Sequence, residues 1–301
     1  MKILVTGGCG FVGSNLVDML VKNSNNQVLV IDNLDTGKKE HCNKEAEYIF
    51  ADIRDVFANS SSIADLAISR TISKKHASFL RDVDVIYHLA ALARIQPSFG
   101  RPIETIHVNA FGTALICEYA RRVGAKVVYS GSSSFYGGTS LNPYAFSKWQ
   151  GEEVCKMYSE VYDLKTTIAR FFNVYGPRHP SSGPYATVVG IFEELTKNNE
   201  PLTIVGDGDQ RRDFTHIDDI CKGMMAIAKD DYKGEVFNLG TGTNHSINEL
   251  ASYFGGETVY LPQRPGEARN TLADISKTTE LTSWLPTKEL REYVKQWLLN
   301  Y

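Results

Sequence analysis

Short apolar runs alternate with longer segments of helical periodicity along most of the chain. The apolar runs predict strands at Lys2–Thr6, Gln27–Ile31, Glu47–Phe50, Asp84–Leu89, Lys126–Ser130 and Thr166–Phe171. The periodic segments predict helices at about Gly13–Lys22, Pro102–Val123 and Tyr144–Tyr162. This alternation is typical of a parallel sheet covered on both faces, so we expect an α/β fold with a Rossmann-type, doubly wound sheet. Asn59–Leu80, rich in serine and lysine, predicts a solvated helix or loop.

Beyond Asn173 the pattern changes to shorter elements, punctuated by turns such as Gly176-Pro177. We interpret this region as a smaller, interleaved α/β part that binds a substrate. Asp218–Lys229 and Glu235–Leu239 again have the pattern of a helix and a strand, which could rejoin the sheet. We therefore expect a larger sheet domain and a smaller domain, formed by residues 1–172 plus about 215–245 and by about 173–214 plus 246–301.

The composition excludes several classes of protein. Net charge is −3 with both signs interspersed, so no basic stripe suggests nucleic acid or an anionic membrane surface. No apolar run is long enough to span a membrane, and glycine follows the first strand too soon for a signal peptide. The five cysteines form no CxxC pattern, and the seven histidines lack the spacing of metal ligands. We expect a cytoplasmic protein without a metal site.

A glycine-rich turn, Thr6–Gly13, follows the first strand and opens the first helix. Glycines in this context let the backbone and the helix N-terminus approach a dinucleotide pyrophosphate. Asp32 ends the second strand, where a carboxylate binds both adenosine ribose hydroxyls and repels a 2′-phosphate, which favours NAD over NADP. Asp52, after the third strand, could reach the adenine. The larger domain is therefore expected to bind NAD.

Tyr144 and Lys148 have the i, i+4 spacing that places two side chains on one face of a helix. A tyrosine needs its pKa lowered from about 10 to about 7 to act as a general base, which corresponds to ~4 kcal/mol. One ammonium at ~4 Å supplies about that much at an effective dielectric constant of ~20. The pair could therefore transfer a proton.

Taken together, the chain resembles the extended short-chain dehydrogenase/reductase family, and within it the nucleotide-sugar 4-epimerases. The resemblance implies a Rossmann domain with an interleaved nucleotide-sugar domain, tightly held and recycled NAD, and a homodimer. It rests on motifs spread over nearly the whole chain: Thr6–Gly13, Asp32–Gly37, His88–Ala91, Ser132–Gly137, Tyr144 with Lys148, Arg170–Asn173, Gly206–Gly208, Arg212–Phe214 and Arg264–Glu267.

The resemblance assigns Tyr144 as the base that removes the sugar O4 proton. Lys148 would bind the nicotinamide ribose and lower the Tyr144 pKa, Ser132 would be the catalytic hydroxyl, and Ser134 a second contact to the sugar. His88 is expected to be a core residue with satisfied hydrogen bonds. The cofactor contacts would be Gly7, Gly10, Phe11, Val12, Gly13, Asp32, Asn33, Asp52, Ile53, Leu89, Ala90, Ala91, Tyr144, Lys148 and Phe171.

The same resemblance implies a UDP-sugar substrate. Arg212 and Arg264 would bind the diphosphate, since a guanidinium matches phosphate oxygens. Glu267 would accept the uridine ribose hydroxyls, and Thr203-Ile204-Val205 would pack against the uracil. Phosphate and sugar contacts would come from Asn173, and Thr187 and Thr271 complete the expected substrate site.

The residues near the nicotinamide favour simple C4 epimerisation. No carboxylate or cysteine lies between Val127 and Leu141, so no second acid/base is available for dehydration or decarboxylation. Thr271, three residues before Asp274, resembles the position that holds a bulky tyrosine in some 4-epimerases. Its smaller side chain implies that UDP-GlcNAc and UDP-GalNAc should fit as well as UDP-glucose and UDP-galactose. The segment Gly138–Pro143 is shorter than in related enzymes, and Ala93 stands where some have a lysine. A decarboxylase, dehydratase or reductase remains an alternative, as does a non-catalytic dinucleotide-binding module.

Overall fold

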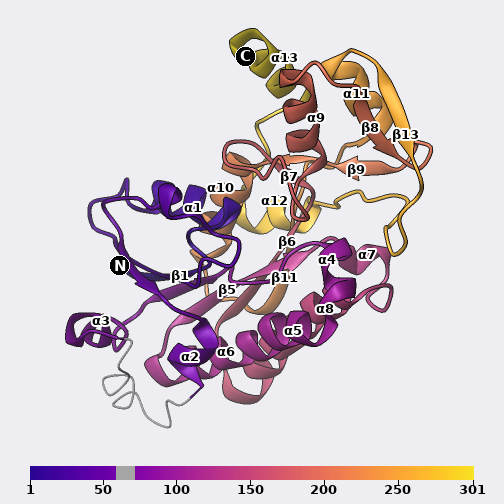
Figure 1. Ribbon diagram of the computed structural model, residues 1–301. Coiled ribbons are helices and arrows are strands. Elements are labelled where there is room, and N and C mark those ends of the chain that lie inside the picture. The colour runs from indigo at the N-terminus through magenta and orange to yellow at the C-terminus, as the bar shows by residue number, and fades with distance from the viewer. Residues whose placement is uncertain (59–71) are drawn as a thin grey trace.

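A computed structural model describes residues 1–58 and 72–301 of the chain (Figure 1). Its centre is a sheet of seven strands in which every neighbouring pair is parallel. This confirms the α/β Rossmann-type fold. From one edge to the other the strands are β11 (Lys233–Leu239), β6 (Thr166–Phe171), β5 (Lys126–Ser132), β4 (Val85–His88), β1 (Lys2–Thr6), β2 (Gln27–Asp32) and β3 (Glu47–Phe50).

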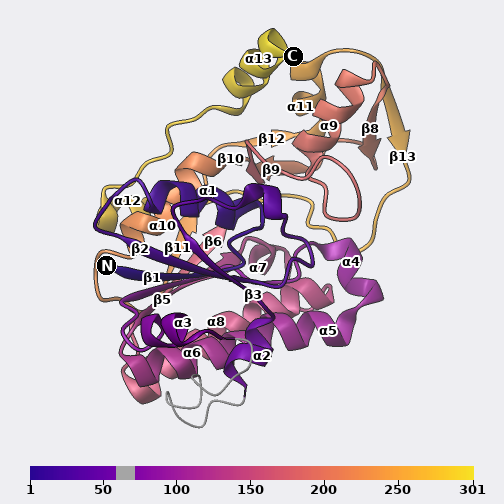
Figure 2. The same cartoon turned by 60° about the vertical axis from the view of Figure 1, so that its left-hand side comes forward.

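Helices cover both faces of this sheet (Figure 2). One face packs against α2 (Ile53–Phe57), α3 (Lys74–Phe79), α6 (Gly112–Val123) and α8 (Pro143–Tyr162). The other packs against α1 (Phe11–Leu20) and α10 (Ile217–Ile227), with α12 (Ser276–Thr282) beside them. Strand alternation divides the side chains between the two cores: Leu4 joins the first, and Ile3 and Val5 join the second.

A third hydrophobic core lies away from the main sheet, at the upper right of Figure 1. Its buried side chains include Phe192, Ile204 and Leu250. The elements that surround it are β7 (Val174–Tyr175), α9 (Val188–Lys197), β8 (Leu202–Val205), β9 (Arg211–Asp213), β10 (Thr215–His216), β12 (Asn244–Ser246), α11 (Ile247–Phe254), β13 (Thr258–Leu261) and α13 (Leu290–Asn300). Three two-stranded sheets join β10 to β7, β12 to β9 and β13 to β8.

The helix expected over Pro102–Val123 is interrupted. It consists of α5 (Pro102–Ile106), a π-helical turn η3 (His107–Phe111) and α6. Within the turn, Asn109 is buried and exchanges hydrogen bonds with the backbone of Leu92, and its amide also donates to the Ser147 hydroxyl. The π turn thus fixes the segment after β4 against α8, and such turns are frequent at functional sites.

Other element bounds differ from the expected ones by a few residues. Of the segment Asn59–Leu80, residues 59–71 lie outside the described part, and α3 forms most of the rest. The described residues also form the short helices η1 (Lys39–His41), α4 (Ile95–Gly100) and α7 (Ser134–Gly137). No helix among the described residues is long and apolar enough to cross a membrane.

Candidate active site

A cavity of about 840 Å³ lies at the carboxyl ends of the central strands, where the sheet meets the third core. All the residues assigned from the sequence to the cofactor and substrate line it, except Ile204. These are Gly7, Gly10, Phe11, Val12, Gly13, Asp32, Asn33, Asp52, Ile53, Leu89, Ala90, Ala91, Ser132, Ser134, Tyr144, Lys148, Phe171, Asn173, Thr187, Thr203, Val205, Arg212, Arg264, Glu267 and Thr271.

The expectation that Ile204 packs against the uracil is wrong. Its side chain is buried in the third core, whereas Thr203 and Val205 on either side line the cavity. The cause is the two-residue period of a strand, which turns alternate side chains of β8 to opposite faces.

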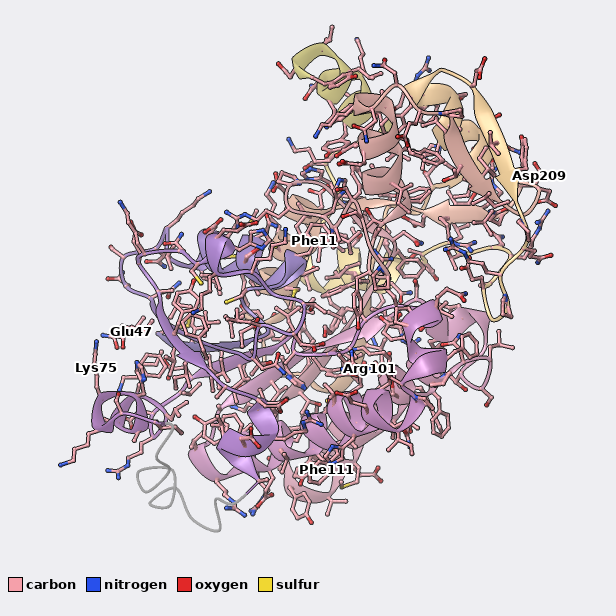
Figure 3. All side chains as sticks on the ribbon, in the orientation of Figure 1. Phe11, Glu47, Lys75, Arg101, Phe111 and Asp209 are labelled. Carbon is pink, nitrogen blue, oxygen red and sulfur yellow. The ribbon has the colours of Figure 1, made fainter. Side chains whose placement is uncertain are left out.

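The glycine turn after β1 has no room for side chains. Gly7 has φ +73°, and a Cβ there would lie 2.7 Å from the Ala90 nitrogen. A Cβ on Gly13 would lie 2.1 Å from the Gly7 carbonyl oxygen. Phe11, labelled in Figure 3, begins α1 directly after this turn. Backbone N–H groups at this helix start are therefore accessible to a pyrophosphate, as the fingerprint requires.

Asp32 and Asp52 occupy the wall next to the glycine turn. The Asp32 carboxylate accepts hydrogen bonds from the backbone nitrogens of Cys9 and Leu34, each at 2.8 Å, while burial raises its pKa. Asp52 accepts from Asn33 Nδ2 at 3.1 Å and from the Arg54 guanidinium, which lowers the Asp52 pKa. These carboxylates and the glycine turn fit the adenosine half and pyrophosphate of NAD.

Ser132, Ser134 and Tyr144 gather where β5 ends and α8 begins. Ser134 donates from its backbone nitrogen and its hydroxyl to Ser132 Oγ, at 3.2 and 2.9 Å. Asn142 caps α8 by accepting from the Ala145 nitrogen at 2.8 Å, and this fixes the first turn that carries Tyr144. Hydrogen bonds therefore hold the backbone that carries Ser132, Ser134 and Tyr144 in place.

Burial raises the Tyr144 pKa, and the Ser132 hydroxyl and the Arg94 guanidinium oppose this rise. The resemblance assigned the lowering of the Tyr144 pKa to Lys148, and this role stays a prediction. Lys148 Nζ donates to Ser130 Oγ at 3.3 Å and lies 4.4 Å from the centre of the Tyr129 ring. The shared helix face brings Tyr144 and Lys148 to one cavity.

Lys148 is itself strongly desolvated, and burial lowers its pKa to about 8. Glu152, one turn further along α8, opposes this shift and also forms a buried ion pair with Arg170, Oε2 to Nη2, at 2.6 Å. Arg170 lies in β6, so this ion pair joins α8 to the sheet beneath the lysine. A cation held in the cavity wall can bind the hydroxyls of a nucleotide ribose.

The residues assigned to the nucleotide of the substrate lie on the third-core side of the cavity. Arg212 Nη2 is 3.7 Å from Glu267 Oε2, and burial lowers the Arg212 pKa. Gln96 Nε2 donates to Glu267 Oε1 at 3.4 Å. The Asn173 amide donates to Thr271 Oγ1 at 3.5 Å, so these two residues share one patch of the wall.

Sequence reasoning missed Arg94, Gln96 and Tyr185, which also line the cavity. They belong to no recognised motif, so their residue types gave no signal. The expectation for His88 is confirmed: its Nδ1 is 2.7 Å from Thr6 Oγ1, and its Nε2 is 3.1 Å from Thr113 Oγ1. Both ring nitrogens therefore have partners in the core.

Comparisons with known proteins agree with this geometry. A provisionally assigned UDP-glucose 4-epimerase of Methanocaldococcus jannaschii is 36% identical, over 99% of this chain and 98% of its own length. UDP-glucuronic acid decarboxylase 6 of Arabidopsis thaliana is 31% identical, over 97% of this chain and 86% of its own. The relatives therefore include both 4-epimerases and decarboxylases.

Solved structures are similar over the full chain. UDP-glucose 4-epimerase of Thermotoga maritima, solved with UDP-glucose, gives a TM-score of 0.88 at 30% identity, over 100% of this chain and 99% of that one. UDP-glucuronic acid 4-epimerase of Bacillus cereus, solved with UDP-glucuronic acid and NAD, gives 0.82 at 31% identity, over 98% and 99%.

The model of the NAD dependent epimerase/dehydratase family matches residues 3–240, most of the chain. The matched region contains the glycine turn, Asp32 and the Ser132, Tyr144 and Lys148 set. NAD, expected from the glycine turn and Asp32, is thereby confirmed as the cofactor. The chain belongs to the NAD dependent epimerase/dehydratase family of enzymes.

Proposed function

We propose that the protein epimerises C4 of a UDP-hexose and regenerates its bound NAD in each cycle. One observation carries the proposal: Ser132 and Tyr144 meet in a single cavity that extends from the glycine turn to Arg212 and Arg264. A dinucleotide at one end and a UDP-sugar at the other would have their reacting groups beside this pair. We also propose that residues 1–172 plus about 215–245 bind NAD and that the remaining residues bind the nucleotide sugar.

In this mechanism Tyr144 accepts the proton of the sugar O4. The Ser132 hydroxyl and the positive charge of Arg94 stabilise the phenolate form against the effect of burial. Bound NAD supplies the chemistry of accepting and returning a hydride at C4. Tyr144 then returns its proton to O4 after the 4-keto sugar has presented its other face, and Lys148 holds the nicotinamide ribose.

The UDP moiety anchors the substrate while the sugar turns. Arg212 and Arg264 would bind the diphosphate, and Glu267 the uridine ribose. Thr271 contacts Asn173 and is small enough to leave room for an N-acetyl group at C2 of the sugar. Both UDP-GlcNAc and UDP-glucose are therefore included as candidate substrates.

The main alternative is decarboxylation of a UDP-uronic acid, because decarboxylases are among the relatives. The chain has no carboxylate between Val127 and Leu141 to act as a second acid/base near the sugar. The cavity wall at this point carries the hydroxyls of Ser132, Ser133 and Ser134 instead. This difference favours epimerisation.

Proton NMR of UDP-glucose, UDP-GlcNAc and UDP-glucuronate, each incubated with the purified protein in D₂O, tests the proposal. We expect the 4-epimer of at least one substrate, without solvent deuterium at C4 and without added cofactor. A pentose product with CO₂ would establish decarboxylation. Unchanged spectra for all three, with and without added NAD, would contradict the proposed function.

Tyr144→Phe separates catalysis from binding. We expect the rate to fall by on the order of 10³-fold, because the base is lost, while NAD remains bound. Tyr136→Phe is the matched control: Tyr136 donates to Asn238 Oδ1 at 2.9 Å and does not line the cavity. Full activity of Tyr144→Phe would show that Tyr144 is not the base.

A further inference from the structure

Arg94 has an unusual backbone conformation at the start of α4, with φ +81° and ψ 142°. Side chains rarely adopt positive φ with such a ψ, and this region is populated almost entirely by glycine. Both flanks of Arg94 are fixed. Asn109 binds the backbone of Leu92 on one side, and on the other Ser98 Oγ accepts from the Tyr144 nitrogen at 3.2 Å. Residues held in this way cluster at ligand-binding sites.

The side chain of Arg94 reaches the cavity beside Tyr144. Its Nε donates to the Tyr185 carbonyl at 3.1 Å, and the residue lines the cavity. Within the described part of the chain, no carboxylate lies within 4 Å of its guanidinium nitrogens. Glu267, the acidic group whose field acts on Arg94, contacts Arg212 and Gln96 instead. Arg94 is partly buried in the cavity wall, and this burial lowers its pKa, while the nearby Tyr144 and Glu267 oppose the shift.

We propose that Arg94 binds a carboxylate on the hexose, so that the preferred substrate is a UDP-uronic acid. This inference rests on the proposed function. Tyr144 acts at O4, and the carboxylate carbon of a uronic acid is attached to C5, the neighbouring ring carbon. A guanidinium beside Tyr144 is thus near that carboxylate. Its planar, bidentate geometry matches a carboxylate, and the ion pair would give this partly buried charge a partner.

The phosphates of the substrate are a less suitable partner for Arg94. The two arginines assigned to the diphosphate lie on the third-core side of the cavity, where Arg212 is in β9 and Arg264 follows β13. Arg94 instead follows β4 and acts on Tyr144, the group at the reacting carbon. Arg94 is therefore closer to the proposed reacting group than the two arginines assigned to the diphosphate.

The test compares kcat/KM for UDP-glucuronate with kcat/KM for UDP-glucose in the native enzyme, in Arg94→Gln and in Arg101→Gln. Arg101, labelled in Figure 3, is the matched control, because it belongs to the same segment and does not line the cavity. Unlike Arg94 it already has carboxylate partners, Glu104 at 2.7 Å and Asp35 at 3.7 Å. We expect the native enzyme to prefer UDP-glucuronate. In Arg94→Gln this preference should fall by about 10- to 100-fold, the usual effect of losing a charge-assisted hydrogen-bonded pair.

The ratio of the two kcat/KM values removes a confounding effect. Arg94 also acts on Tyr144, but both substrates use the same base, so a change in Tyr144 acidity cancels from the ratio. A preference for UDP-glucose in the native enzyme, or an unchanged ratio in Arg94→Gln, would overturn the proposal. Loss of NAD from Arg94→Gln would also overturn it, because the arginine would then hold the cofactor.

Failure of the proposed function gives a different result. If neither substrate is epimerised, calorimetric titration of UDP-glucuronate and UDP-glucose into the native protein and Arg94→Gln decides the question. Selective binding of the uronate that Arg94→Gln abolishes would support the carboxylate site without epimerisation. Equal binding of both nucleotide sugars would refute it.

Arg94→Gly is a second variant, in which a loss of the preference for UDP-glucuronate could not be explained by unfolding. Glycine adopts the observed backbone conformation freely, so we expect the melting temperature to rise. The preference for UDP-glucuronate should fall as it does in Arg94→Gln. A variant that is more stable and still prefers the uronate would rule out the proposed role of the side chain.

Discussion

The acidity of a single phenol decides how the proposed chemistry depends on pH. Burial raises the Tyr144 pKa, whereas the Ser132 hydroxyl and the Arg94 charge lower it. The phenolate is the form that accepts the O4 proton, so the activity of the free enzyme should increase as pH rises through this pKa. Any change that removes the nearby cation should move this increase to higher pH.

Arg94→Gln should therefore shift the acidic limb of the kcat/KM profile for UDP-glucose upward by about one pH unit. The sign follows from the charge, because a phenolate loses a favourable interaction and the phenol holds its proton more tightly. UDP-glucose is the substrate for this measurement since it carries no carboxylate on the sugar. Arg101→Gln should keep the native profile, and an unmoved limb in Arg94→Gln would show that the guanidinium does not act on Tyr144.

For individual residues, the sequence allowed the prediction of site residues that belong to a motif. The glycines could be proposed from their spacing after a strand, and Ser132 and Tyr144 from the resemblance of their motifs to those of a known family. Arg94 could not, since its importance depends on a positive φ and on two distant anchors. The contacts of Lys148 with Ser130 and Tyr129 are also a matter of rotamer and packing, so the i, i+4 spacing could not predict them.

Among the elements, the connection from β1 to α1 leaves the least freedom for substitution. The carbonyl of Gly7 closes the turn, and the first residues of α1 pack directly against it. The same turn must present its backbone to the pyrophosphate of NAD, so any displacement of the helix start moves those N–H groups.

Gly13→Ala should weaken NAD binding by at least about 100-fold and lower the melting temperature. The new Cβ would lie 2.1 Å from the Gly7 oxygen and 2.8 Å from Gly8 Cα, and backbone atoms in a turn cannot move aside locally. NADH fluorescence titration and thermal unfolding measure both effects. Gly100→Ala is the matched control, since a Cβ there meets no atom within 4 Å. Native NADH affinity in Gly13→Ala would contradict the prediction.

Periodicity predicted most elements correctly because the strands of the central sheet are buried and apolar. The same reasoning, applied within β8, would have separated Ile204 from Thr203 and Val205. The π turn at His107–Phe111 is different. It exists because the Asn109 side chain binds Leu92 and Ser147, which are distant in sequence, and helical periodicity contains no information about such contacts.

For the molecule as a whole, His88 joins three elements at the centre of the fold. Its ring nitrogens pair with Thr6 at the end of β1 and Thr113 in α6, while the residue itself ends β4. Burial, together with the charge of Lys148, lowers its pKa from 6.5 to about 3. The native state therefore requires a neutral imidazole.

Stability should consequently fall as the solution becomes acidic. The pKa is depressed in the folded state, so the unfolded chain binds the extra proton from about pH 6.5 downward, and the loss continues until about pH 3. Between pH 6 and 4 this amounts to about 2–3 kcal/mol. Urea unfolding at several pH values measures it. His88→Gln should remove this part of the pH dependence and His107→Gln should retain it; equal slopes in the native protein and His88→Gln would refute the assignment.

The backbone at Arg94 finally has an evolutionary consequence. Exchange of arginine for glycine requires a single nucleotide change in several codons, and it would relieve the positive φ. An arginine kept at this position over many generations would therefore imply selection for its side chain. We expect a duplicated gene that is released from that selection to drift to glycine at this position, and to become both more stable and less selective among sugars.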